Sequence, residues 1–156
     1  MGEGLKKDPL KVADRLRGLC SRREYPSSDI LKKALTELDG DRKEAERIVS
    51  RLIEEKYVDD SRYAMAFARD KASIAGWGEV KIRHMLQAKG IPMDMINEAL
   101  EEIDEGKATA RLEKLLEVKS RSLRDDPQKK LKLLRFALGR GYSYDDVKSV
   151  IDRLLK

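Results

Sequence analysis

The sequence is poor in the residues that form disulfides, metal sites and catalytic centres. It holds one cysteine and one histidine among 156 residues, and only 5% of its residues are aromatic. Cys20 cannot form an internal disulfide, and it shares an apolar stripe with Leu16 and Leu19, which indicates a packed thiol. The Cys and His spacing that ligates zinc is absent. A lone thiol fits a reducing compartment, so we expect a cytoplasmic protein.

Long apolar runs are also missing. No stretch reaches the length that would cross a bilayer, and no apolar segment follows the lysines near the N-terminus. We therefore expect neither a membrane contact nor a secretory signal.

Catalytic constellations are missing as well. His84 lies among basic residues, and the sequence pattern predicts no nucleophile or carboxylate close to it. Residues 76–78 are too short for a phosphate-binding loop. The pair Asp59 and Asp60 precedes an amphipathic segment, where carboxylates typically cap a helix. We expect no enzyme activity, no cofactor and no metal ion.

What the sequence does contain is a repeat of 51 residues. Shifting the chain by that interval aligns eight sets of three apolar residues, and their spacing of three and four is typical of amphipathic helices. No stretch shows the alternation typical of a strand. The aligned sets are Ala13, Ala64 and Leu115; Leu16, Phe67 and Val118; Leu31, Ile82 and Leu133; Ala34, Met85 and Phe136; Leu35, Leu86 and Ala137; Ala45, Ile96 and Val147; Val49, Leu100 and Ile151; and Leu52, Ile103 and Leu154.

The repeat predicts an all-α protein with three tandem three-helix repeats of about 51 residues in an elongated, curved array. Ser27 and Ser143 are expected to cap helices, and a glycine follows the second helix of each repeat, where a left-handed residue ends a helix readily. We expect a tail at residues 1–9 and repeats at 10–60, 61–111 and 112–156. The nine helices are expected at residues 9–22, 27–38, 41–56, 60–74, 77–89, 93–104, 106–121, 127–139 and 143–155.

The net charge of +5 comes from the last third of the chain. Residues 112–156 carry twelve basic and seven acidic groups, whereas residues 10–60 and 61–111 are each balanced. Between Lys119 and Arg140, eight basic residues accompany only two aspartates. Such a local field attracts polyanions, although a solvated helical face would have the same composition.

Three short motifs stand out along the chain. Residues 57–64 show an aromatic turn, two aspartates and a helix that opens with an arginine and an aromatic residue. Residues 76–91 contain a Gly-rich turn, an Ile-Arg pair and a Lys-Gly-Ile ending, and residues 130–142 form a basic helix that ends in Arg-Gly-aromatic. In these motifs the chain resembles the RecX family of RecA regulators, with a weaker match at residues 23–27. The resemblance covers nearly the whole chain.

The chain departs from the family pattern at two turns. A glycine common before the aromatic residue of the first motif is Lys56 here, and a proline common after the Gly-x-Gly turn is Glu79.

The resemblance implies a helical-repeat protein that binds the RecA filament on single-stranded DNA. Members of the family mostly inhibit strand exchange, ATP hydrolysis and co-protease activity, and some block filament growth or promote disassembly. We accordingly expect RecA, and the single-stranded DNA within its filament, as partners of a monomeric chain. Capping of filament ends and coating of the filament groove both stay open.

A curved rod with a basic stripe could lie along that groove and touch several RecA subunits. We therefore predict the contact residues among the basic side chains of the last two repeats, although each could serve solubility instead. Trp77 could stack on a base or pack between repeats. The predicted contacts are Lys81, Arg83, Lys89, Lys129, Lys130, Lys132, Arg135 and Arg140, with Arg62, Arg69 and Trp77 as second choices.

Two other functions also fit the pattern. Short helices joined by tight turns occur in nucleic-acid-binding modules, and the basic helix at residues 127–139 could enter a groove of duplex DNA. A helical repeat could instead act as a scaffold that recognises a protein and no nucleic acid.

Overall fold

The computed structural model describes residues 7–156, so the first six residues of the predicted tail lie outside the described part. Within that range the chain forms nine α-helices and no strand, which confirms the all-α class. The helices are α1 (Pro9–Arg22), α2 (Ser27–Glu37) and α3 (Arg42–Glu54); α4 (Asp60–Ser73), α5 (Glu79–Ala88) and α6 (Met93–Glu101); and α7 (Glu105–Ser122), α8 (Lys129–Gly139) and α9 (Tyr144–Leu154).

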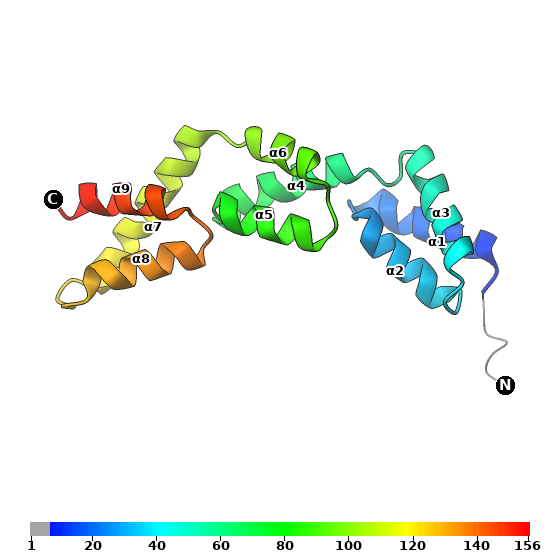
Figure 1. Ribbon diagram of the computed structural model, residues 1–156, viewed down its shortest axis with the longest axis horizontal. Helices are drawn as coiled ribbons and strands as arrows, with labels where there is room; N and C mark the ends of the chain where they lie inside the picture. Colours follow the sequence, from blue (N-terminus) through cyan, green and yellow to red (C-terminus); the bar gives the residue numbers. More distant parts are fainter. Residues whose placement is uncertain (1–6) are drawn as a thin grey trace.

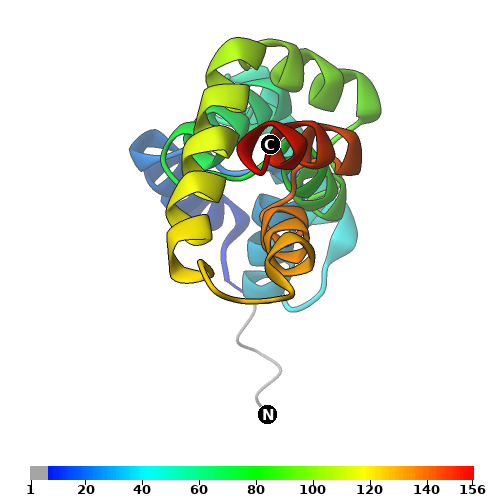
Figure 2. The ribbon, with the colours of Figure 1, turned by 90° about the vertical axis from the view of Figure 1, so that its left-hand side faces the viewer.

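The nine helices form three groups that follow one another along an arched rod (Figure 1). The first and last repeats lie at opposite ends of this rod, and a view along it shows the groups one behind another (Figure 2). The elongated, curved array predicted from the repeat is thus confirmed. None of the helices in residues 7–156 combines the length and apolar character needed to cross a membrane.

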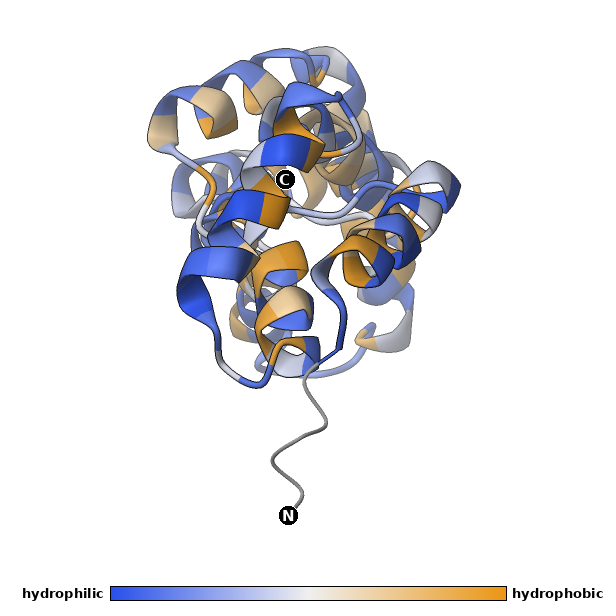
Figure 3. Cartoon of the chain, turned by 90° about the vertical axis from the view of Figure 1, so that its right-hand side faces the viewer, coloured by the Kyte–Doolittle hydropathy of each residue, from blue (hydrophilic) through white to orange (hydrophobic). Residues whose placement is uncertain are grey.

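Each group of three helices encloses its own hydrophobic core. The hydropathy colouring alternates along the helices, as amphipathic helices require (Figure 3). No core residue is shared between groups, so each repeat buries its own apolar side chains. The fully buried anchors are Leu16, Ile30, Leu38 and Leu52 in the first repeat, Ile82, Leu86 and Ile96 in the second, and Leu112, Leu116, Leu133 and Ile151 in the third.

The apolar match predicted for the first helix of the third repeat is wrong. Ala64 and Ala68 are buried in α4, but the buried residues of α7 are Leu112 and Leu116, which lie 48 residues further on. Val118, which the 51-residue repeat placed in the core, is 55% exposed.

The early start of α7 explains this difference. Only residues 102–104 separate it from α6, and the side chain of Asp104 caps it by accepting a hydrogen bond from the Lys107 amide at 3.0 Å. The helix therefore begins at Glu105, and the repeat boundary predicted between residues 111 and 112 falls inside it.

The predicted helix caps are confirmed at two positions and wrong at a third. Asp59 accepts a hydrogen bond from the Arg62 amide, and Ser143 accepts one from the Asp146 amide. Ser27 caps nothing, because its hydroxyl group donates to the carboxylate of Asp60, in the second repeat, at 2.6 Å.

Left-handed backbone occurs at the three predicted glycines, at Gly76, and at two non-glycine residues, Asp39 and Lys56. The glycines after α2, α5 and α8 all have positive φ angles. Lys56 also has a positive φ, of 68°, at the turn where the resembled family commonly has a glycine. The turn therefore keeps its geometry with a lysine, at a cost of about 1 kcal/mol.

The second and third repeats join through backbone hydrogen bonds. The amides of Gly78 and Val80, at the start of α5, donate to the carbonyl oxygens of Arg140 and Gly141, each at 2.8 Å. The hydroxyl group of Tyr142 donates to the Gly76 carbonyl at 3.1 Å. The carbonyl groups at the C-terminal end of α8 thus accept hydrogen bonds from amides at the N-terminus of α5, which have no partner within their own helix.

The first and second repeats join through polar side chains. The Ser28 hydroxyl donates to the carbonyl oxygen of Lys89 at 2.6 Å, and the Lys89 ammonium lies 3.1 Å from the carboxylate of Asp29. The Ser27 amide donates to Asp60 at 2.7 Å. The C-terminal end of α5 therefore meets the first turn of α2.

As a result, the second helices of the three repeats stand end to end in the order α8, α5, α2. They follow the concave lower edge of the rod in Figure 1. The C-terminus of one helix meets the N-terminus of the next, so the helix dipoles are aligned favourably. We call these three helices, with the turns that follow α5 and α8, the second-helix row.

We expect Gly78→Ala to destabilise the protein by about 1 to 3 kcal/mol, because a Cβ atom there would lie 2.5 Å from the Gly141 backbone. Urea unfolding followed by circular dichroism measures the change. The matched control is Gly139→Ala, whose Cβ atom would meet nothing within 4 Å. Equal stability of the Gly78 variant and the wild type would contradict the close packing of this junction.

Candidate functional site

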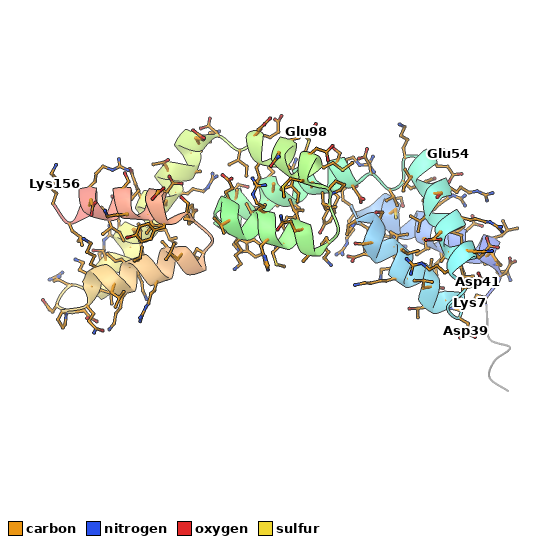
Figure 4. All side chains as sticks on the ribbon, in the orientation of Figure 1. Lys7, Asp39, Asp41, Glu54, Glu98 and Lys156 are labelled. Atoms are coloured by element: carbon orange, nitrogen blue, oxygen red, sulfur yellow. The ribbon has the colours of Figure 1, made fainter. Side chains whose placement is uncertain are left out.

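All eight first-choice contact residues lie in the second-helix row. Three come from α5 and its C-terminal turn, and five from α8 and its C-terminal turn. Figure 4 shows Glu54 and Glu98 on the opposite, upper edge of the rod. The second-choice residues Arg62 and Arg69 lie on α4, outside the row.

Two of the predicted contacts in the second repeat are held by the protein itself. The Lys89 ammonium pairs with Asp29 across the junction with the first repeat. The guanidinium group of Arg83 lies 3.3 Å from Glu79 and donates to the side-chain oxygen of Asn97 at 2.9 Å. Glu79, which replaces the proline common in the resembled family, therefore anchors Arg83.

The second-choice arginines are also paired. Arg62 donates to the carboxylate of Glu24 in the first repeat and to the Lys56 carbonyl, and the bond with Glu24 raises the pKa of the guanidinium group. Arg69 lies 3.3 Å from Asp70. Arg62 therefore fixes the junction of the first two repeats.

The basic residues of α8 are more accessible. Lys130 lies 3.8 Å from Asp152, and a hydrogen bond from Lys132 lowers the pKa of Asp126. Across the described residues, Lys129 and Arg135 form no ion pair. Because surface pairs are weak and screened by salt, Lys130 and Lys132 can exchange their partners for an anionic ligand, and Lys129 and Arg135 can bind one directly.

Trp77 is half-buried and packs inside its own repeat. Its ring meets Phe67 edge to face at a centroid distance of 6.1 Å. The ammonium groups of Lys71 and Lys81 lie 4.7 and 4.3 Å from its centroid, which is the geometry of cation–π contacts. These contacts lie within the second repeat, whereas the packing role considered from the sequence was between repeats.

Sequence reasoning missed a basic hollow in the third repeat. A groove of about 510 Å³ opens between α7 and α8, beside Gly76 of the second repeat. We call it the α7–α8 groove. Four basic residues line it, and no carboxylate does. Its lining residues are Gly76, Arg111, Lys114, Leu115, Val118, Lys119, Ser122, Phe136, Arg140 and Tyr142.

The sequence of α7 contains the apolar and basic pattern that lines this groove, but the 51-residue repeat aligned α7 in the wrong register. Arg111, Leu115, Val118 and Ser122 follow one another at helical spacing, so they form one stripe of the helix. The 51-residue repeat assigned the apolar members of that stripe to the core. The observed register of α7 turns Val118 toward the groove, whereas Leu115 lines the groove and also packs against the edge of the third core.

A second hollow has the opposite character. It measures about 980 Å³ and lies between the second and third repeats. Carboxylates prevail among its charged lining residues, which are Glu79, Glu101, Asp104, Glu105, Arg111, Asp146 and Arg153. The two hollows give the third repeat distinct basic and acidic surfaces.

The remaining titratable candidates show no site chemistry. Among residues 7–156, no group of three or more His, Cys, Asp or Glu side chains is placed to hold a metal. His84 is exposed on α5. Cys20 is buried in the first core, and burial raises the pKa of its thiol, as expected of a packed residue.

We expect Lys89→Ala to lower the free energy of unfolding by about 0.5 to 1 kcal/mol, because it removes the ion pair with Asp29 at the first junction. The loss should shrink in high salt, since the pair is partly exposed. Urea unfolding at low and high salt measures both effects. The control is Lys148→Ala on α9, which removes an exposed lysine outside the junctions. An equal effect of both substitutions would contradict the junction role.

Two family models match this chain. The model described as the second three-helix domain of RecX matches residues 59–100, and the one described as the third three-helix domain matches residues 107–151. These ranges cover the helices α4 to α6 and most of α7 to α9.

Similar proteins carry the name Regulatory protein RecX. One from Clostridium tetani is 34% identical over 119 residues, which are 74% of this chain and 54% of the relative. Another, from Salmonella arizonae, is 30% identical over 129 residues, which are 83% of this chain and 77% of the relative. The chain thus spans about half the length of the clostridial relative.

Solved structures of the same name share the fold. A crystal structure of regulatory protein RecX has a TM-score of 0.82 at 26% identity and covers 92% of this chain and 71% of its own. RecX from Lactobacillus salivarius also reaches 0.82, at 22% identity, and covers 94% and 96%. The repeat motifs, the nine-helix rod and these matches together show that the chain belongs to the RecX family.

Proposed function

We propose that this chain modulates the RecA recombinase, mostly as an inhibitor, by binding the RecA filament on single-stranded DNA. The observation that carries the proposal is the second-helix row, whose helices lie along one edge of a long rod. Its helices α8 and α5 carry the accessible cations of α8 and Lys81. Membership in a family named for regulation supports it.

The row suits a polymeric, anionic target. Lys81, Lys129, Lys130, Lys132 and Arg135 can attract DNA phosphates, and each neutralised phosphate releases counterions. Lys89 and Arg62 support the rod from within, since their charges bridge the first two repeats.

The rod also suits a regulator that acts by holding subunits together. A long body joined by short junctions can touch more than one filament subunit at once. Bridging of this kind opposes the subunit motions that ATP hydrolysis and strand exchange require. The chain then suppresses ATPase, strand-exchange and co-protease activity by binding alone, without a catalytic step of its own.

RecA ATPase activity on single-stranded DNA, titrated with this protein, tests the proposal. We expect ATP hydrolysis to fall as the protein is added. Loss at sub-stoichiometric ratios indicates capping of filament ends, and loss only near stoichiometry indicates coating of the groove. Unchanged hydrolysis at saturating protein would contradict the proposed function.

Charge reversal on α8 tests the assigned surface. We expect the triple variant Lys130→Glu, Lys132→Glu, Arg135→Glu to weaken filament binding at least tenfold, because it removes the phosphate-facing charges and leaves the core intact. The matched control reverses three exposed residues of α3, with Lys43→Glu, Arg47→Glu and Arg51→Glu. Equal inhibition by wild type, variant and control would remove α8 from the site.

Gel shifts separate this function from a plain DNA-binding module. A filament regulator binds the RecA–DNA complex well and free DNA poorly, and its affinity falls steeply between low and moderate salt. Tight binding to short duplex DNA without RecA would favour the DNA-binding module instead.

A further inference from the structure

The α7–α8 groove combines an apolar floor with a basic rim. Leu115, Val118 and Phe136 form apolar parts of the lining, and Val118 is 55% exposed. The rim carries four cations and no carboxylate, and none of them forms an ion pair within the described residues. The rim cations are Arg111, Lys114, Lys119 and Arg140.

The second repeat fills the corresponding place with its own tryptophan. In the observed register of α7, Leu115 corresponds to Phe67 and Lys119 to Lys71. In the second repeat, Trp77 packs edge to face on Phe67, with the Lys71 ammonium 4.7 Å from its centroid. An aromatic side chain from the α4–α5 connection therefore covers the apolar position and lies beneath the lysine.

The third repeat has no aromatic residue at the position of Trp77, and its Lys119 lies over Phe136 of α8 instead. Residues 123–128, which connect α7 to α8, contain no aromatic residue. Leu115 and Val118 therefore stay open to the groove. An aromatic ring inserted there would remove the apolar surface of Leu115 and Val118 from water.

The rim identifies the charge of the occupant. Four cations that share one groove without a carboxylate repel one another, and an anionic ligand relieves that repulsion. Tyr142 also lines the groove, and burial raises the pKa of its hydroxyl group, which donates a hydrogen bond to the Gly76 carbonyl.

The floor favours a peptide over a nucleic-acid base. The Lys119 ammonium and the Arg140 guanidinium already lie over the Phe136 ring, 5.1 and 5.2 Å from its centroid. A base that stacked on this ring would displace them, whereas a side chain on Leu115 and Val118 leaves them in place to bind carboxylates.

We propose that the α7–α8 groove binds an acidic segment of a partner protein and takes one aromatic side chain of that segment onto Leu115 and Val118. The acidic side chains around this anchor pair with the rim. The groove shares only Arg140 with the predicted filament contacts, and the other three rim cations come from α7, so this inference goes beyond the proposed function and does not require RecA.

Fluorescence anisotropy with synthetic probes tests the site on the full chain. The probe is a fluorescein-labelled ten-residue peptide of Asp and Glu with one central Trp. Its two comparison probes are the same peptide with Ala in place of Trp and a ten-nucleotide oligothymidylate. We expect the Trp peptide to bind at least tenfold more tightly than either comparison probe. Equal binding of the two peptides, or tighter binding of the oligonucleotide, would overturn the proposal.

Two variants separate the rim from the floor. Lys114→Glu with Lys119→Glu reverses rim charges, and Val118→Trp fills the floor without a change of charge at an exposed position that the core does not need. Each should weaken binding of the Trp peptide at least tenfold, with helicity unchanged by circular dichroism.

The matched control for the rim variant is Lys43→Glu with Arg47→Glu on α3, which makes the same change of net charge away from the groove. Wild-type affinity in the groove variants, or equal loss in the control, would contradict the assignment. Loss of peptide binding with RecA inhibition intact would show that the two surfaces act independently.

Discussion

The structure depends on how the second helices meet end to end. At one junction, backbone amides of α5 donate to the last carbonyl groups of α8, and Gly78 packs directly on Gly141. At the other, the end of α5 bonds to Ser28 and Asp29 at the start of α2. These contacts hold three small cores in one rod. Without them, each repeat would be an independent three-helix unit with a small buried core.

This docking divides the basic residues into two kinds. Lys89 and Arg62 form ion pairs with Asp29 and Glu24, respectively, and these pairs stabilise the rod. The cations of α8 and of the α7–α8 groove remain accessible to ligands. The net charge of the chain therefore does not show which cations can bind an anionic ligand. The positions of the carboxylates do, because they neutralise the cations at the first junction and leave the third repeat basic.

The sequence predicted the helices closely because each carries a regular apolar stripe and recognisable ends, such as the cap at Ser143. It failed at α7, since the early start of that helix rotates Val118 out of the core. It also did not show which lysines pair across junctions, because Lys89 and Asp29 stand 60 residues apart. The α7–α8 groove was therefore not predicted because the register of α7 was wrong. The ion pairs between repeats were not predicted because their partners are far apart in the sequence.

The rod-like arrangement of the repeats is the central claim, and small-angle X-ray scattering of the full chain tests it most directly. A compact globular protein of this length would have a radius of gyration of about 15 Å. The end-to-end junctions predict a clearly larger value and a pair-distance distribution with a long tail. A symmetric distribution with a radius near about 15 Å would contradict the rod, and with it the shared edge on which the basic residues lie.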